Sequence, residues 1–376
     1  MTRRSDTTMQ DSELEAAITN WEPRVIANGV DPNDYRRIVA AVGSWAEWLP
    51  AWEKHGDTLV GLAIEAEQLG RDQTAGELWR RAASSYHFGK FVWIVDLERH
   101  ARATKKAAAA FTNALRLLDP SALRLEIPFD GAQLIATYRR PAPPLGSGSA
   151  ETALEENASE VPLVLIIAGL DSTKEEFFGT EEIFHSRGLA TLTLDGPGQG
   201  EVGLSLPIRP DFELPVAAAL DYLDQHTDSK HTRIGAVGLS LGGYYVARVA
   251  AFERRIQAAA GVSGPYDFSA NWEGMPQLTR ATFAHASRAG DDDQARELAA
   301  SFSLDGVAEK IAQPLLVITG DRDRIVPWQQ TKRIADAAPH ATWCLYEGGN
   351  HVVNNMPYLY KTLVADWLRE RLSLSS

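Results

Sequence analysis

The fold is indicated most clearly by the residues Ile234-Gly235-Ala236-Val237-Gly238-Leu239-Ser240-Leu241-Gly242-Gly243. It begins as a buried strand and leads directly into a helical stretch, so its Gly-x-Ser-x-Gly pattern has the strand-turn-helix context of a nucleophilic serine. Small residues are needed two positions before and after Ser240, because side chains at this sharp turn would collide with the strand and the helix. At the helix N-terminus, the N–H of Leu241 can face a developing oxyanion. The alternative interpretation is a glycine-rich turn with an inert serine.

A serine hydroxyl needs a base that accepts its proton and a carboxylate that orients the base. In this type of fold both follow the serine, the acid before the histidine. Two aspartates compete for the acid, Asp321 and Asp323, which follow the apolar run Leu315–Thr319. We favour Asp323, the third residue after the glycine. His351 follows Gly-Gly-Asn after the last apolar run and is the predicted base.

A second oxyanion donor is expected in the loop after the first strand of the parallel series. The loop reads Ala168-Gly169-Leu170-Asp171-Ser172 and makes the N–H of Leu170 the candidate. A second glycine-rich stretch, Asp195–Gly200, lacks the Lys-Ser/Thr pair of a phosphate-binding loop. We interpret that stretch as a structural turn that supports the site.

The region that contains these motifs alternates short apolar runs with amphipathic stretches, which is typical of a mainly parallel sheet covered by helices on both faces. Two further strands, joined by Asp130-Gly131, predict a hairpin at its start. We therefore expect an α/β fold with a mostly parallel eight-stranded sheet in residues 121–376. An insertion at about 264–309 precedes the run that leads to the acid. Residues 141–160, rich in Pro, Gly, Ser and Glu, are expected to form an exposed connection.

Residues 1–120 show helical spacing of apolar residues and almost no strand-like alternation, which predicts an all-α N-terminal domain. One predicted helix covers Pro32–Trp52 and presents Trp45, Trp48 and Trp52 on one face. We interpret these tryptophans as a packing stripe, with a ligand-binding aromatic wall as the alternative.

The composition disfavours several classes of function. The net charge of −13 disfavours binding to nucleic acid. A single cysteine, a polar start without an apolar signal sequence and the absence of a long apolar run predict a cytoplasmic protein that does not span a membrane. No cysteine and histidine cluster has zinc-site spacing, so no metal or cofactor is expected.

Three stretches together resemble the 2,6-dihydroxypseudooxynicotine hydrolase group of α/β-hydrolases: Gly169–Glu176, Asp195–Glu201 and Ser240–Gly243. The resemblance implies hydrolysis of a carbon–carbon bond next to a ketone, in a small aromatic substrate. It also implies that the N-terminal helices act as a lid and that the enzyme is a homodimer. Because the sheet region alone would leave the strand ends open to water, we expect the insertion to contribute to this lid. In this group a glutamate assists the reaction, and Glu273 lies only approximately at its position.

The combined prediction is a serine hydrolase with Ser240, Asp323 and His351 as catalytic triad, acting on a 1,3-diketone or an acyl-phenol. A carboxylic ester or lactone hydrolase would use the same three residues and differ in the leaving group. A scaffold whose helices bind another protein is the third interpretation, and it is disfavoured because all three triad elements occur in the required order.

Overall fold

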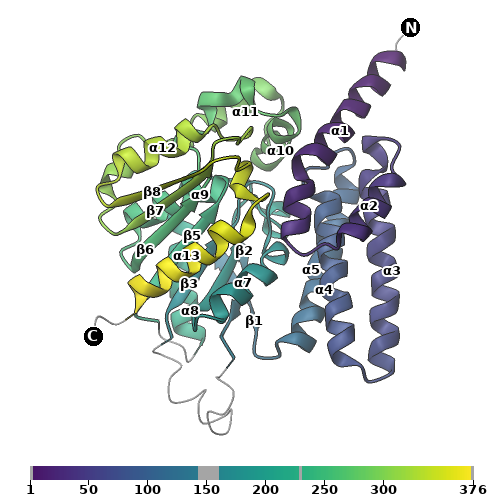
Figure 1. The fold of residues 1–376 in the computed structure, drawn as a ribbon, viewed down its shortest axis with the longest axis horizontal. Coiled ribbons are helices and arrows are strands. Elements are labelled where there is room, and N and C mark those ends of the chain that lie inside the picture. Colours follow the sequence, from purple (N-terminus) through teal and green to yellow (C-terminus); the bar gives the residue numbers. More distant parts are fainter. Residues whose placement is uncertain (1–2, 143–160, 228–230, 374–376) are drawn as a thin grey trace. The chain divides into compact units, whose positions relative to one another are not determined.

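The computed structural model describes residues 3–142, 161–227 and 231–373. Two compact units make up the chain, and they are coloured by sequence in Figure 1. The first contains Met1–Ala122 together with the short segment Glu175–Gly179, and the second contains Leu123–Lys174 and Thr180–Ser376. Most of the connection expected at 141–160 lies outside the described residues.

The first unit is helical. Its elements are α1 (Arg3–Ala27), α2 (Pro32–Ala40), the 3₁₀ turn η1 (Trp45–Glu47), α3 (Trp48–Gln68), α4 (Asp72–Lys90) and α5 (Leu97–Leu118). Helices α3, α4 and α5 run alongside one another (Figure 1). Between them lies an apolar core that includes Leu59, Tyr86 and Phe111. Asp96 caps the start of α5 by accepting the N–H of Arg99 at 2.9 Å, which satisfies one of the free donors of the first turn.

The helix predicted over Pro32–Trp52 is wrong in its extent. The chain leaves α2 after Ala40, and Ser44 is fully extended (φ −154°, ψ 159°) before the chain becomes helical again at Trp45. The preceding Gly43 lowers the helical preference at this break. The packing interpretation of the tryptophans is confirmed, because Trp45, Trp48 and Trp52 are no more than 2% exposed.

The second unit is built on an eight-stranded sheet with the order β1-β2-β4-β3-β5-β6-β7-β8. The first two strands form the predicted hairpin, β2 pairs antiparallel with β4, and every later neighbouring pair is parallel. The predicted fold class is therefore confirmed. The strands are β1 (Leu123–Phe129), β2 (Ala132–Arg139), β3 (Leu163–Ile167), β4 (Ala190–Asp195), β5 (Ile234–Leu239), β6 (Ile256–Val262), β7 (Leu315–Gly320) and β8 (Ala341–Tyr346).

Helices cover both faces of this sheet, and α13 crosses in front of the strands in Figure 1. The strands β3, β4, β5 and β7 are buried along their whole length, which explains their continuous apolar runs. The covering helices are α7 (Phe178–His185), α8 (Glu213–His226), α9 (Leu241–Phe252), α12 (Trp328–Ala337) and α13 (Pro357–Leu372).

The insertion between β6 and β7 contains η4 (Ser269–Gly274), α10 (Gln277–Ser287) and α11 (Asp292–Ala299). It is held in the second unit by aromatic packing. Phe283 of α10 contacts Phe268, Trp272 and Phe302, and Phe302 in turn contacts Tyr244 of α9. The insertion is therefore an ordered part of the sheet unit.

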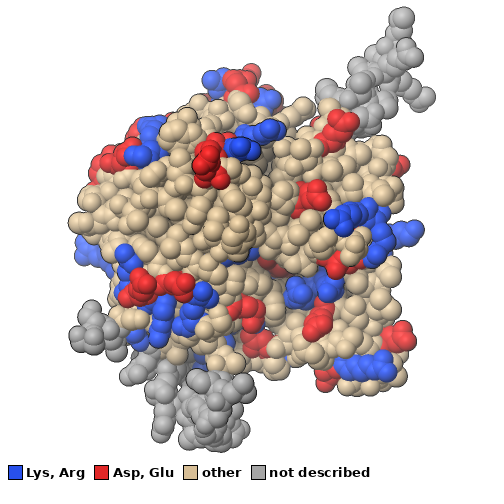
Figure 2. All heavy atoms as spheres, viewed as in Figure 1, with Lys and Arg blue, Asp and Glu red and all other residues tan. Residues whose placement is uncertain are grey.

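On the face shown in Figure 2, acidic and basic side chains alternate and form no broad area of a single sign. Within the residues that the structure describes, no helix combines the length and hydrophobicity needed to cross a membrane.

Candidate active site

Ser240 occupies the sharp turn between β5 and α9. Its backbone has φ 58° and ψ −127°, which is a strained conformation for a residue with a side chain. The flanking glycines make the turn feasible: a Cβ on Gly238 would lie 1.9 Å from the carbonyl oxygen of Gly242. A Cβ on Gly242 would lie 2.4 Å from the carbonyl oxygen of Ile167. The small residues around the serine are therefore required by close backbone contacts, as the sequence pattern predicts.

The structure brings Ser240, His351 and Asp323 together. Nε2 of His351 lies 2.8 Å from Oγ of Ser240, and Nδ1 of His351 lies 2.7 Å from Oδ2 of Asp323. The carboxylate of Asp323 can only accept a hydrogen bond, so Nδ1 of His351 carries the ring proton and donates a hydrogen bond to Asp323. This leaves Nε2 free to accept the hydroxyl proton of Ser240. The three side chains thus form a continuous hydrogen-bonded chain with the polarity that proton removal from the serine requires.

The two candidate acids occupy different environments. The side chain of Asp323 is fully buried, and its Oδ1 accepts the N–H groups of Ile325 and Val326, each at 2.9 Å. These two bonds fix the carboxylate so that its other oxygen faces His351. Asp321 is exposed, and its Oδ1 accepts the N–H of Gly348 at 2.7 Å. The structure therefore places Asp323, and not Asp321, against the histidine.

The histidine loop is held by a residue that the sequence did not reveal. Val352 and Val353, directly after His351, have φ values of 57° and 52°, which β-branched residues rarely adopt. The hydroxyl of Ser263 accepts the N–H of Val352 at 3.0 Å and lies 3.1 Å from the hydroxyl of Thr319. Ser263 directly follows β6, and its place at the carboxyl end of a parallel strand is the only signal that could have identified it.

One proposed oxyanion donor lies at the start of α9 and the other in the loop after β3. Leu241 is the first residue of α9, where backbone N–H groups have no partner within the helix. Leu170 follows Gly169, and a Cβ on Gly169 would lie 3.0 Å from Cβ of Ser240. The loop after β3 therefore runs directly beside the serine.

Glu273 does not share this environment. Its side chain is 72% exposed and pairs with Arg296 at 3.1 Å and with Arg280 at 3.8 Å. These are surface ion pairs, so the structure gives no support to a role for Glu273 in proton transfer. The sequence position of Glu273 only approximately matched its motif, and the local geometry of η4 turns the side chain to solvent.

A polar run after Leu170 is buried, which the sequence did not predict. Each residue from Ser172 to Glu176 is at most 7% exposed. The amine of Lys174 contacts Asp195 at 3.0 Å and Glu201 at 2.8 Å. Glu176 belongs to the helical unit and is bound there by Arg24. These buried ion pairs explain how a stretch with two glutamates and a lysine can leave the surface.

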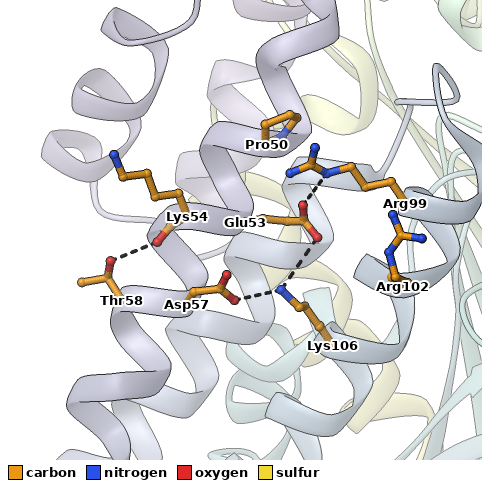
Figure 3. A pocket seen from close by; sticks show the side chains of 8 residues that line it. All are labelled: Pro50, Glu53, Lys54, Asp57, Thr58, Arg99, Arg102 and Lys106. Carbon is orange, nitrogen blue, oxygen red and sulfur yellow. Dashed lines mark hydrogen bonds and ion pairs between the residues drawn. The ribbon is translucent and has the colours of Figure 1, made fainter.

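The helical unit carries a surface hollow of about 720 Å³ between α3 and α5 (Figure 3). Four of its charged side chains form ion pairs with one another. The buried Glu53 lies between Arg99, at 2.6 Å, and Lys106, at 3.9 Å, and Lys106 also contacts Asp57 at 2.9 Å. Neither Ser240 nor its two partners line this hollow, so it is separate from the candidate active site.

Residues 176–374 match the sequence profile of the prolyl oligopeptidase family, and this range covers more than half of the chain. The match includes the serine turn, the acid loop and the histidine loop described above. The chain is an α/β-hydrolase of this family.

This α/β-hydrolase is 30% identical over 363 residues to 2,6-dihydropseudooxynicotine hydrolase of Paenarthrobacter nicotinovorans, covering 95% of this chain and 93% of that protein. A crystal structure of 2,6-dihydroxy-pseudo-oxynicotine hydrolase superposes with a TM-score of 0.82 at 29% identity, covering 94% of this chain and 96% of the other. The 20-hydroxy-prefusarin hydrolase of Gibberella moniliformis is 33% identical over 239 residues. That match covers 60% of this chain and only 54% of the fungal protein. The chain is therefore an enzyme of the hydrolase class.

Proposed function

We propose that this enzyme uses Ser240 as nucleophile, His351 as base and Asp323 as orienting acid to cleave a carbon–carbon bond next to a ketone. The observation that carries the proposal is the hydrogen-bonded chain through His351, with distances of 2.8 Å to Ser240 and 2.7 Å to Asp323. The substrate class is supported by the similarity, over nearly the full length of both chains, to a 2,6-dihydropseudooxynicotine hydrolase.

In the first step His351 takes the proton of Ser240 while the serine oxygen attacks the ketone carbon. The carbonyl oxygen becomes an oxyanion, which the N–H groups of Leu241 and Leu170 stabilise. When the oxyanion collapses, the bond to the neighbouring carbon breaks and its electron pair leaves with that carbon. The imidazolium of His351 protonates the carbon, so the first product carries a new C–H bond.

The second step returns the enzyme to its starting state. The acyl group remains on Ser240 as an ester, and a water molecule that has lost a proton to His351 attacks it. The products are a carboxylic acid and the free serine. The sequence of steps consumes one water and needs no oxidant, reductant or metal.

The need for a carbon leaving group restricts which ketones can be substrates. A carbanion leaves only when its charge spreads over a second group, as in an enolate or a phenolic tautomer. The preferred substrates are therefore 1,3-diketones or aromatic ketones with a phenolic ring, of small-molecule size. Because Glu273 is exposed and paired with arginine, we assign protonation of the leaving carbon to His351 alone.

A carboxylic ester or lactone hydrolase is the second candidate, since the same triad cleaves esters without a stabilised carbanion. The discriminating experiment compares matched ketone and ester analogues of one aromatic scaffold, with products followed by mass spectrometry in heavy-oxygen water. We expect cleavage of the activated ketone with one heavy oxygen in the acid product. Cleavage of the ester alone would favour the second candidate.

Three further features of the enzyme are proposals. We propose that the N-terminal helices and the insertion serve as a lid over the substrate, that the enzyme is a homodimer and that it works in the cytoplasm. Light scattering of the purified protein tests the dimer. For the lid, substrate should change the fluorescence of the tryptophans in the helical unit, and an unchanged spectrum at saturating substrate would argue against it.

A further inference from the structure

The glycine-rich turn after β4 contains a buried amide whose hydrogen-bonding groups are all engaged. Gln199 is 1% exposed. Its Nε2 donates to the carbonyl oxygens of Ala168 at 2.8 Å and of Gly169 at 2.9 Å, and its Oε1 accepts the N–H of Gly196 at 2.9 Å. The structural role expected for the turn Asp195–Gly200 is thus confirmed, because Gln199 of this turn binds the backbone of the loop after β3.

The bond to Gly169 controls the direction of one particular N–H. The carbonyl of Gly169 and the N–H of Leu170 belong to the same planar trans peptide group, so they point in opposite directions. A donor that holds the Gly169 oxygen therefore also fixes where the Leu170 N–H points. That N–H is the second oxyanion donor in the proposed mechanism.

The same peptide group lies against the nucleophile. A Cβ on Gly169 would lie 3.0 Å from Cβ and 3.5 Å from Oγ of Ser240. A tilt of this peptide would alter the contact with Ser240 as well as the direction of the Leu170 N–H. Gly169 carries no side chain that could resist such a tilt, so its orientation depends on hydrogen bonds to its carbonyl.

The far end of the loop is attached to the same turn. The N–H of Lys174 donates to Oδ1 of Asp195 at 2.8 Å, and its amine lies 3.0 Å from Oδ2 of that residue. Asp195 is fully buried. The loop Ala168–Lys174 is therefore held at both ends, by Gln199 on the strand side and by Asp195 on the helix side.

We propose that Gln199 is a positioning residue that fixes the Gly169–Leu170 peptide so that the Leu170 N–H faces the oxyanion formed at Ser240. This inference rests on the proposed function, because it assumes that Ser240 is the nucleophile. Gln199 acts only through the loop and does not touch the substrate. Its loss should weaken binding of the tetrahedral state more than binding of the substrate.

The test replaces Gln199 with methionine, which keeps the length and volume but lacks the amide. The probes are 4-nitrophenyl acetate for kcat and KM, and phenylboronic acid, which forms a tetrahedral adduct on a nucleophilic serine. We expect Gln199→Met to lower kcat about tenfold to a hundredfold, with KM changed less than about threefold. Affinity for the boronic acid should fall by a similar factor to kcat.

Gln313→Met is the matched control, because the amide of Gln313 also donates to a backbone carbonyl, that of Ala250 at 2.6 Å. It should keep kcat and boronic acid affinity. If Gln199→Met does not fold, Gln199→Glu supplies the second variant. Its buried carboxyl can donate one hydrogen bond only while protonated, so its kcat relative to wild type should fall as the pH rises.

The outcomes separate this inference from the proposed function. If both Gln199 variants keep kcat and boronic acid affinity within twofold of wild type while Ser240→Ala is inactive, the positioning role is wrong and the triad proposal stands. If Ser240→Ala keeps full activity, the proposed function fails, and the positioning role fails with it.

Discussion

Arg24 and Glu176 form a two-pronged ion pair across 152 positions of sequence, with N–O distances of 2.8 Å and 2.7 Å. Asn28 and His87 donate to the same carboxylate at 2.7 Å and 3.0 Å. Burial raises the pKa of Glu176, but Arg24 and the hydrogen bonds from Arg24 and His87 outweigh it and hold that pKa well below its usual range. Glu176 thereby fixes the segment Glu175–Gly179 within the helical unit.

Glu176→Gln should strongly destabilise the helical unit. The substitution removes the carboxylate charge that pairs with the buried guanidinium of Arg24. Breaking a buried ion pair from one side costs about 3–5 kcal/mol. Urea denaturation followed by tryptophan fluorescence measures the change. The control is Glu98→Gln. The side chain of Glu98 is 91% exposed and lies 3.7 Å from Arg102, so this substitution should lower the free energy of unfolding by about 0.5 kcal/mol or less. A loss of stability no larger in Glu176→Gln than in the control would contradict the account of this ion pair.

His87 should make stability depend on pH below neutrality. Burial lowers the pKa of His87 from its ordinary 6.5, and its bond to Glu176 only partly opposes this. The unfolded chain therefore binds a proton more readily than the folded one, so stability is complete above pH 6.5 and declines as the pH falls below that value. Replacing His87 with glutamine keeps a hydrogen-bond donor for Glu176 but removes the ionisable group.

The measurement is the Tm of wild type and His87→Gln between pH 5.5 and 7.5. The wild-type Tm should fall relative to that of the variant as the pH decreases. A difference that stays constant over this range would show that His87 does not titrate on unfolding as inferred.

The choice of acid is tested by two neighbouring substitutions. Asp323→Asn should lower kcat about 10³- to 10⁴-fold, because an amide in place of the carboxylate no longer holds the imidazole with its proton on Nδ1. Asp321→Asn should change kcat less than threefold, since the carboxylate of Asp321 is exposed and accepts the backbone N–H of Gly348. Steady-state kinetics on one ester substrate suffices. The reverse order of effects would mean that Asp321 is the acid.

The strained turn at Ser240 predicts that Gly242→Ala is inactive. The new Cβ would lie 2.4 Å from the carbonyl oxygen of Ile167 and 2.8 Å from that of Ala168, so the serine turn must shift. Overpacking of this kind also destabilises by about 1–3 kcal/mol.

Gly61→Ala is the matched control. A Cβ at this exposed position of α3 meets no atom within 4 Å, and it should stabilise the protein by about 0.5–1 kcal/mol. Activity assays and thermal melts of both variants check the pair. An active Gly242→Ala would show that the turn tolerates a side chain there.

The sequence predicted the parts of the fold whose pattern is local. Continuous apolar runs mark the buried parallel strands, and Gly-x-Ser-x-Gly marks the turn because close backbone contacts permit few other residues there. Ser263 and Gln199 escaped notice as individual positions, since their roles arise from contacts to loops far away in sequence. The buried run Ser172–Glu176 is a further case: its charges have partners in α1, α4 and the β4 turn, and no local pattern indicates that those partners meet.

The role of Ser240 as nucleophile is tested most directly by covalent labelling of the intact enzyme with a fluorophosphonate, followed by peptide mapping by mass spectrometry. A serine activated by His351 should react at its oxygen. We therefore expect one adduct on Ser240, which is absent in Ser240→Ala and forms much more slowly in His351→Ala. An unlabelled enzyme, or an adduct on a different serine that persists in Ser240→Ala, would contradict the assignment of Ser240 as the nucleophile.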